Sequence, residues 1–255
     1  MKKIYVAILV PSYNEVANLP IVIENIIRVS SKLDHTTRIV IIDDGSTDGT
    51  IRTIGSIKKS KSLSSEQVTL LVHPFNCGVG VAMRTGFRYA KENGFDYAIQ
   101  IDADGQHSPE SFPAILERLI QGANLVIGSR FLLDQTIPTE SSHTSKKRAW
   151  VLRVVSKIIS RASNVKITDA TSGFRGVDMK AITYFADHYP SEYLGDTLNS
   201  IILAKSKGYT IEEIPVVMKS RISGNRSQNY YRSFLFLLRA LLNVMIFQIE
   251  RRKND

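Results

Sequence analysis

The sequence has little that would cross-link a small secreted domain or anchor a chain in a bilayer. Of its 255 residues only Cys77 is a cysteine, so no internal disulfide can form, which suits a reducing compartment. No run of about 18 apolar residues is free of charge, which predicts that no helix spans a membrane. The apolar run after Lys3 is too short for a signal peptide, so we expect a cytoplasmic protein.

Acidic residues are also scarce relative to basic ones. The chain holds 33 lysines and arginines against 24 aspartates and glutamates, which gives a net charge of +9. Such an excess attracts anionic partners, namely membrane lipids, phosphorylated substrates or nucleic acid. Because no nucleic-acid-binding motif accompanies the basic clusters, we expect no nucleic acid partner. Apolar residues make up 43% of the chain, which is ordinary for one globular α/β domain with a sizeable core.

The most informative segment is an acidic turn at residues 100–107, QIDADGQH. Asp102 and Asp104 directly follow a β-rich run at 97–101, and a glycine after Asp104 predicts that the strand ends and the chain turns. Clustered carboxyl oxygens at a strand end suit a hard divalent cation, Mg²⁺ or Mn²⁺. Taken alone, the same pattern is common in ordinary surface turns.

Two further strands end in the same way. An apolar run at 38–42 leads into Asp43 and Asp44, and Asp48 or Ser46 can cap a helix that begins near Thr50. An apolar run at 4–10 leads into the loop PSYNE and then into a helical pattern. In open α/β sheets the ligand crevice lies outside the carboxyl ends of the strands, so we expect these three loops to converge there.

Ordered motifs connect the chain with a known family. The segments PSYNE, DDGSTDG, DADGQH and GSRF stand at 11–15, 43–49, 102–107 and 128–131. Their order and spacing resemble family 2 glycosyltransferases, inverting enzymes of the GT-A fold that use nucleotide-sugar donors. The segments DATSGFR at 169–175, GYTIEEIPV at 208–216 and RISG at 221–224 resemble the branch of dolichyl-phosphate mannose synthases and bacterial polyprenyl-phosphate sugar synthases. The resemblance covers nearly the whole chain and implies one Rossmann-like α/β domain, with a mostly parallel sheet flanked by helices.

The resemblance also implies a cation and donor site. Asp102 and Asp104 would hold Mg²⁺ or Mn²⁺ with Gln106 as an additional ligand, although Asp102 could instead contact the ribose or reach the metal through water. The glycines of the segment 76–80 would allow the donor to approach the backbone closely. Structural alternatives are that Tyr13 lies in the core and that Asp43 only caps a helix. The residues expected to bind the nucleotide sugar are Pro11, Tyr13, Glu15, Asp44, Asn76, Gly78, Asp102 and Ala103.

The acceptor side depends on the kind of acceptor. A lipid phosphate is already ionised near neutral pH, so it needs cations that position it rather than a strong base. The guanidinium groups of Arg130, Arg175 and Arg221 match phosphate oxygens, and Ser227 and Asn229 could add donors. The alternative is that these arginines only pair with surface carboxylates.

One segment departs from the family pattern. Many relatives carry closely spaced glutamates after a Tyr-Pro pair, whereas here Asp196 is the best acidic substitute, with Glu192 behind it. If the acceptor is a hydroxyl, Asp196 is the candidate general base. If the acceptor is a phosphate, we expect Asp196 to orient the sugar or an arginine.

Domain boundaries follow from composition. We expect a glycosyltransferase domain at 1–228, with a mobile polar loop at 134–146 and a basic amphipathic helix at about 147–162. Packing on the sheet would explain that helix as well as a membrane surface would. Residues 229–255 should form an amphipathic helix that faces a membrane or an oligomer partner rather than the core. We therefore expect a peripheral protein at the inner face of the cell membrane, with a separate membrane protein as a possible partner.

Three readings of function remain at this point. The first is metal-dependent transfer of a sugar from a UDP- or GDP-linked donor to a polyprenyl phosphate. The second uses the same donor but extends a cell-envelope polysaccharide or lipid-linked glycan at a sugar hydroxyl. The third is a non-catalytic nucleotide-sugar-binding protein, which should have lost its acidic metal ligands. A nucleotidyltransferase is less favoured, because the loop at 11–15 has neither glycine nor a cation for a triphosphate.

Overall fold

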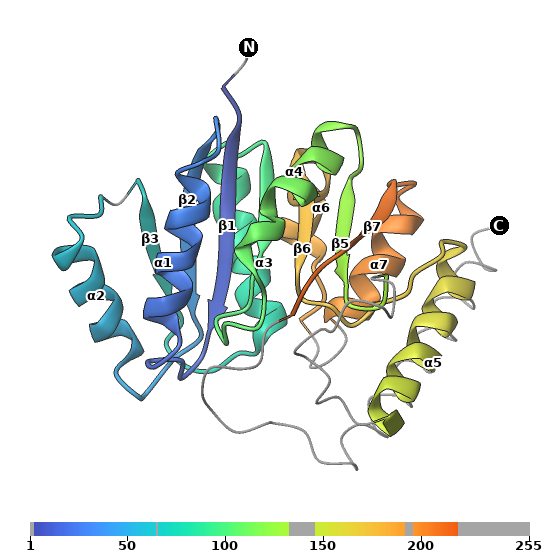
Figure 1. Cartoon of the computed structure of the whole chain (residues 1–255), viewed down its shortest axis with the longest axis horizontal. Coiled ribbons are helices and arrows are strands. Elements are labelled where there is room, and N and C mark those ends of the chain that lie inside the picture. The colour runs from blue at the N-terminus through green and yellow to red at the C-terminus, as the bar shows by residue number, and fades with distance from the viewer. Residues whose placement is uncertain (1–2, 65, 133–145, 192–195, 219–255) are drawn as a thin grey trace.

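The computed structural model describes residues 3–64, 66–132, 146–191 and 196–218, in which one sheet of seven strands runs through the molecule (Figure 1). The strands are β1 (Tyr5–Ser12), β2 (Thr36–Asp43), β3 (Val68–Val72), β4 (Tyr97–Gln100), β5 (Leu125–Ser129), β6 (Arg175–Asp178) and β7 (Ile211–Pro215). Their order is β3-β2-β1-β4-β6-β5-β7. Only β6 runs antiparallel to its neighbours among these strands. The expected mostly parallel α/β sheet is therefore confirmed.

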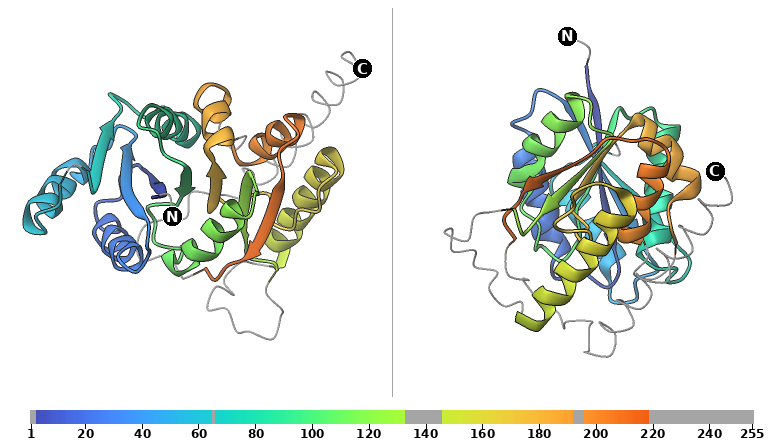
Figure 2. Two further views of the ribbon diagram at one scale, coloured as in Figure 1. Left: turned by 90° about the horizontal axis from the view of Figure 1, so that it is seen from above. Right: turned by 90° about the vertical axis from the view of Figure 1, so that its right-hand side faces the viewer.

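Helices cover both faces of this sheet (Figure 2). They are α1 (Leu19–Ser30), α2 (Thr50–Ser60), α3 (Val79–Glu92), α4 (Phe112–Ile120), α5 (Lys146–Ser163), α6 (Met179–His188) and α7 (Asp196–Ser206). Buried residues of α1, α2 and α4 belong to one apolar cluster, whereas those of α3, α5, α6 and α7 belong to the other. A short 3₁₀ turn at Pro109–Ser111 leads into α4.

The central strands read as continuous apolar runs because both of their faces are covered. In β1 the side chains alternate between the two clusters, with Ala7 and Leu9 on the side of α3 and Ile8 and Val10 on the side of α1. All four are at most 1% exposed. Full burial of a large aliphatic side chain stabilises the fold by about 1.5–3 kcal/mol. Because a slip of one residue would move every side chain to the opposite face of the sheet, this burial fixes the register of these strands.

The loops after β1 and β2 are joined by hydrogen bonds at the carboxyl end of the sheet. The backbone N–H of Asn14 donates to Ser46 Oγ (2.9 Å), and that of Thr47 donates to Asn14 Oδ1 (2.8 Å). Helix α2 begins at Thr50, whose backbone N–H donates to Asp48 Oδ1 (3.0 Å). The N-cap residue of α2 is Gly49 and no side-chain hydrogen bond caps the helix, so the expectation that Asp48 or Ser46 caps it is wrong; Asp48 contacts Thr50, and Ser46 contacts the neighbouring loop. The first two of the expected loops thus meet.

Helix α5 confirms the helix expected at 147–162, and its packing is now defined. Val155 and Ile159 are fully buried, whereas Arg153, Lys157 and Arg161 are exposed. Within the described ranges, no helix is both long enough and apolar enough to cross a membrane. The expected mobile loop lies almost wholly outside the described residues, and the expected helix at 229–255 lies entirely outside them.

Candidate active site

The acidic loop after β4 folds back on itself through hydrogen bonds from backbone N–H groups to its own side chains. The N–H of Asp102 donates to His107 Nδ1 (3.2 Å), and the N–H of Gln106 donates to Asp104 Oδ1 (3.0 Å). Gly105 has a φ of 76°, which favours glycine at this turn. His107 is 5% exposed and stacks on Phe174, with ring centroids 5.1 Å apart. Sequence reasoning gave His107 no role, although it closes the matched motif; the structure shows that it fixes the loop.

The carboxylate of Asp102 lies beside Gly173, in a space that a larger residue at position 173 would fill. A Cβ atom on Gly173 would lie 2.8 Å from Asp102 Oδ2, so glycine leaves the space that the carboxylate occupies. The Asp102 side chain is 39% exposed, and Asp104 and Gln106 are half-buried in the same turn. Two carboxylates and an amide oxygen are the donor set of a hard cation, so these residues fit Mg²⁺ or Mn²⁺. Ala103 is buried, so any contact that it makes with a donor must come from its backbone.

Arg130 meets a buried carboxylate rather than a surface one. Its Nε and Nη2 donate to Asp169 Oδ2 (2.6 Å) and Oδ1 (2.7 Å), a two-pronged ion pair, and Nη2 also donates to Thr171 Oγ1 (2.9 Å). Burial lowers the pKa of Arg130, but the hydrogen bonds and charge of Asp169, helped by the charge of Asp102, raise it above its ordinary value. Arg130 is therefore a fixed cation beside the acidic loop.

Arg175 was expected to contact the acceptor phosphate, but it is buried in the protein interior at 4% exposure. Its guanidinium donates to four acceptors, the carbonyls of Ser172, Ala170 and Thr197 and the hydroxyl of Ser200, at 2.7–2.8 Å. In this arrangement the guanidinium faces protein acceptors and not an acceptor phosphate, so we correct the expected role. Arg175 instead ties the segment before β6 to the start of α7.

Asp196 is the first residue of α7 and is 5% exposed. Burial raises its pKa to about 6; the charge of Arg175 offsets part of this effect, and the charge of Asp102 adds to it. Asp196, Asp102 and Arg175 thus share one electrostatic environment at the carboxyl end of the sheet. A carboxylate with a pKa near the working pH is suited to accept a proton from a hydroxyl.

The residues expected to bind the donor differ in how far they are exposed. Tyr13 is 46% exposed, so the alternative that it belongs to the core is wrong. Asn76 is exposed, whereas Pro11 and Glu15 are half-buried. These side chains stand at the carboxyl ends of β1 and β3, on the side of the sheet edge where the donor was expected.

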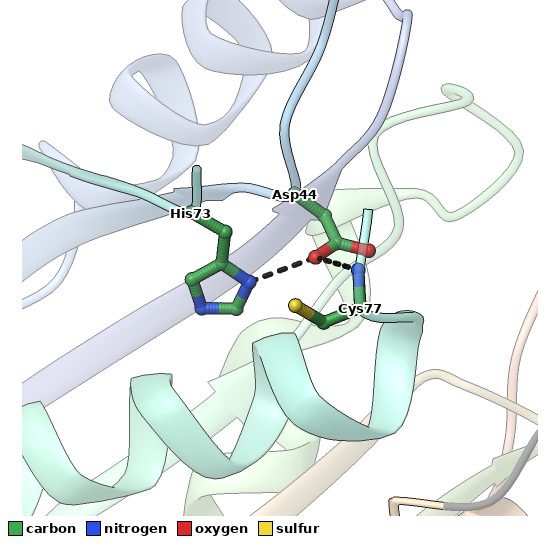
Figure 3. Close-up of side chains that lie close together, drawn as sticks. All are labelled: Asp44, His73 and Cys77. Atoms are coloured by element: carbon green, nitrogen blue, oxygen red, sulfur yellow. Dashed lines mark hydrogen bonds and ion pairs between the residues drawn. The ribbon is translucent and has the colours of Figure 1, made fainter. Parts of the chain in front are cut away.

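Asp44 is turned into the loop that precedes α3 (Figure 3). Its Oδ1 accepts from the N–H of Cys77 (2.9 Å), and its Oδ2 accepts from the N–H of Gly78 (2.7 Å). His73 Nδ1 lies 2.7 Å from the same Oδ1. At 3% exposure Asp44 therefore shapes the loop from beneath, and a direct contact with the nucleoside stays a prediction.

The two glycines of this loop have different functions. Gly78 has a φ of 93°, and a Cβ atom there would meet open space, which agrees with a close approach by a donor. A Cβ atom on Gly80 would collide with the carbonyl oxygen of Pro190. Gly80 therefore serves packing between α3 and the segment before α7, and the expectation for it is corrected. Arg221, Ser227, Asn229 and Glu192 lie outside the described residues.

Curated proteins of similar sequence are named for polyprenol, undecaprenyl phosphate or dolichyl phosphate. The chain is 30% identical over 204 residues to undecaprenyl-phosphate mannosyltransferase of Micrococcus luteus, an alignment that covers 79% of this chain and 72% of the relative. It is 26% identical to polyprenol monophosphomannose synthase of Mycolicibacterium smegmatis, over 85% of this chain and 78% of the relative. It is also 26% identical to UDP-N-acetylglucosamine–dolichyl-phosphate N-acetylglucosaminyltransferase of Methanococcus voltae, over 92% and 94%.

Solved structures share the fold at low sequence identity. Glucosyl-3-phosphoglycerate synthase of Mycobacterium tuberculosis, in complex with Mn²⁺, UDP and phosphoglyceric acid, superposes with a TM-score of 0.64 at 16% identity, over 94% of this chain and 78% of that one. A mannosyltransferase of Pyrobaculum calidifontis, in complex with GDP-Man and Mn²⁺, gives 0.64 at 17%, over 98% and 65%. The model of the family "Glycosyl transferase family 2" matches residues 7–185, which contain the acidic loop, the Arg130–Asp169 pair and the donor loops. The chain therefore belongs to glycosyl transferase family 2 and is a GT-A glycosyltransferase.

Proposed function

We propose that this glycosyltransferase moves one sugar from a nucleotide-diphosphate sugar to a polyprenyl phosphate. The observation that carries the proposal is the meeting of an open acidic loop, a fixed arginine and a buried carboxylate at one edge of the sheet. The relatives named for undecaprenyl, polyprenol and dolichyl phosphates support the lipid acceptor. The solved structures of the same fold that hold UDP or GDP-Man support a nucleotide donor.

On the donor side, the loops after β1 and β3 would bind the nucleoside. Tyr13 offers an exposed ring for stacking on a base, and Pro11 and Glu15 flank it in the same loop. The exposed Asn76 and the backbone of Gly78 would line the opposite side, held in place by Asp44. The choice between UDP and GDP then depends on the hydrogen bonds that these loops offer to the edge of the base.

Asp102, Asp104 and Gln106 would hold Mg²⁺ or Mn²⁺ beside the donor diphosphate. A divalent cation at that position would stabilise the charge of the departing nucleoside diphosphate. The protein prepares the site with its own groups: His107 fixes the backbone of the loop, and Gly173 leaves room for the Asp102 carboxylate.

On the acceptor side, Arg130 would position the phosphate of the lipid, together with Arg221. Asp169 orients the guanidinium of Arg130 through its two oxygens, so the cation is set before the acceptor arrives. Asp196 would orient the sugar. The attacking oxygen of a phosphate is already ionised near neutral pH, so this reaction needs no proton acceptor.

A second candidate function is favoured by Asp196 itself. With a pKa of about 6 its carboxylate is mostly ionised at neutral pH and can take a proton from a sugar hydroxyl. That chemistry suits extension of a polysaccharide or lipid-linked glycan. A pH–rate profile with an acid limb near pH 6 that is lost in Asp196→Asn, while a residual rate remains, would favour the hydroxyl acceptor.

Labelled nucleotide sugar, polyprenyl phosphate and Mn²⁺ or Mg²⁺ test the first candidate directly. We expect the label in a lipid product that mild acid cleaves, and an acid-stable glycan would contradict the proposal. Asp104→Ala should abolish both sugar transfer and hydrolysis of the nucleotide sugar, because it removes a cation ligand, and it should leave the protein folded. Glu24→Ala, at an exposed glutamate of α1, is the matched control.

We further propose that the protein works at the inner face of the cell membrane, where its lipid acceptor would be held. The exposed basic residues of α5, Arg153, Lys157 and Arg161, carry the charge that anionic headgroups attract. Co-sedimentation with vesicles that contain anionic lipid, at low and high salt, measures this attraction. A membrane protein that anchors the chain is an additional possibility for the same surface.

A further inference from the structure

A second group of metal-binding side chains lies beneath the donor loop. Asp44 follows β2, His73 follows β3, and Cys77 precedes α3, yet one ligand atom of each lies within 4.8 Å of the others (Figure 3). The atoms are a carboxylate oxygen, an imidazole nitrogen and a thiol sulfur. Among the residues that the structure describes, no other group of three or more His, Cys, Asp and Glu ligands lies this close together.

The donor set differs in kind from that of the acidic loop. Asp102, Asp104 and Gln106 offer oxygen only, which Mg²⁺ and Mn²⁺ prefer. Sulfur, nitrogen and oxygen together are the ligands of Zn²⁺, which takes four ligands in a tetrahedron and accepts water as one of them. We propose that Asp44, His73 and Cys77 form a second cation site, selective for a thiophilic divalent ion of the Zn²⁺ class.

The surroundings already orient the ligands. The Asp44 side chain is 5% exposed, and the N–H of Gly78 holds its Oδ2. His73 Nδ1 faces Asp44, whereas its Nε2 lies 3.0 Å from Thr85 Oγ1. A histidine that binds a metal usually donates its other N–H to a nearby acceptor, and the hydroxyl of Thr85 can accept as well as donate.

Binding needs a small movement and a simple transfer of protons. Nδ1 of His73 and Oδ1 of Asp44 are 2.7 Å apart, whereas two tetrahedral ligands with bonds of about 2 Å are separated by about 3.3 Å. The pair must therefore open by about half an ångström, because the ion takes the place of a shared proton. The imidazole proton moves from Nδ1 to Nε2, and the Nε2–H then donates a hydrogen bond to Thr85 Oγ1. The thiol of Cys77 releases its proton to solvent.

Occupation of this site should inhibit sugar transfer, a consequence that rests on the proposed function. Asp44 and Cys77 shape the loop that carries Asn76 and Gly78, which we place against the donor. An ion that changes the spacing of these three side chains would change this loop. Excess Mg²⁺ should not reverse the effect, because oxygen-preferring ions compete poorly for a thiolate.

The test is a titration of the full chain, freed of metal, with Co²⁺ as a spectroscopic stand-in for Zn²⁺. We expect one equivalent to produce a sulfur-to-cobalt charge-transfer band in the near ultraviolet, which Zn²⁺ then removes. Cys77→Ser should lose the band and bind Zn²⁺ at least tenfold more weakly in competition with a chromophoric chelator. His73→Asn is the second variant, and thermal unfolding shows whether each variant is folded.

Asp104→Ala is the matched control, because it removes a ligand of the other site and should keep the band. Absence of a band in the wild-type protein, equal Zn²⁺ affinity in folded Cys77→Ser, or loss of the band in folded Asp104→Ala would each overturn the proposal. These readings use no donor or acceptor, so they do not depend on sugar transfer. Inhibition by Zn²⁺ is measured separately, relative to the rate of each variant without Zn²⁺.

Discussion

Replacing Asp196 by asparagine should make the protein more stable at neutral pH while it impairs sugar transfer. Burial raises the pKa of Asp196 to about 6, against an ordinary value of 3.8. At 1.36 kcal/mol per pKa unit, this difference corresponds to about 3 kcal/mol of unfolding free energy. The side chain lies 5% exposed at the start of α7, so solvent screens little of this cost.

The sign follows from the order of the two pKa values. Because the folded-state pKa lies above the unfolded one, the stabilisation by protonated Asp196 is complete below about pH 4 and is lost as the pH rises through about 6. Asparagine resembles the protonated carboxyl at every pH. The variant should therefore exceed the wild-type protein in unfolding free energy by about 3 kcal/mol above pH 7 and by roughly half of that at pH 5.

Urea unfolding at pH 5 and pH 8 measures the difference. Asp34→Asn, at an exposed aspartate, is the control and should show no such growth with pH. A gap between Asp196→Asn and wild type that stays constant, or a variant that is less stable at pH 8, would refute the idea that a buried charge strains this position. The rate of sugar transfer by the same preparations tests whether the charged carboxylate of Asp196, which destabilises the fold, is needed for activity.

Two further predictions concern the packing around the acidic loop. Gly173→Ala should raise the Mn²⁺ concentration needed for half-maximal transfer, because the added Cβ would crowd the Asp102 carboxylate. Gly122→Ala is the control: its Cβ would meet open space, but its φ of 109° adds strain. It should lower the unfolding free energy without changing the Mn²⁺ concentration needed. Arg175→Lys should lower the unfolding free energy by about 2–4 kcal/mol, because an ammonium cannot serve all four acceptors and each buried group left unpaired costs about 1–3 kcal/mol. Denaturant titration measures the loss of unfolding free energy. An unfolding midpoint unchanged from wild type would contradict the prediction, because it would mean that water satisfies the acceptors that the guanidinium leaves.

The sequence could predict those parts of the fold whose pattern is local. The apolar runs at 4–10, 38–42 and 97–101 became strands, because each is long enough and apolar enough to be buried on both faces. The acidic turn, the donor loops and the helix at 147–162 followed from the same reasoning. The family motifs singled out Asp102, Asp104 and Arg130, and in the structure the charge of Asp102 acts on Arg130 and also on Asp196, which lies in the segment that departs from the family pattern.

What the sequence could not predict depends on partners far away along the chain. Strand β6 is only four residues, RGVD, and begins with an arginine, a residue that is rarely buried. Its guanidinium can be buried because acceptors from residues 170, 172, 197 and 200 surround it. In the same way, Gly80 serves the carbonyl of Pro190, and His73 meets Asp44 only after β2 and β3 pair. None of these contacts leaves a periodic signal.

The reversed direction of β6 has a consequence for how this enzyme can diverge. Because β6 runs against β4 and β5, the residues that precede it, and not those that follow it, lie at the carboxyl ends of β4 and β5, where we place the site. The seven residues from Asp169 to Arg175 are anchored at both ends, by the ion pair of Asp169 with Arg130 and by the hydrogen bond of Arg175 to Thr197, and Gly173 between them lies close to the Asp102 carboxylate. An insertion there would displace all three contacts together. Evolution of a new nucleotide preference should therefore use the turns after β1 and β3, where length can change without disturbing these contacts.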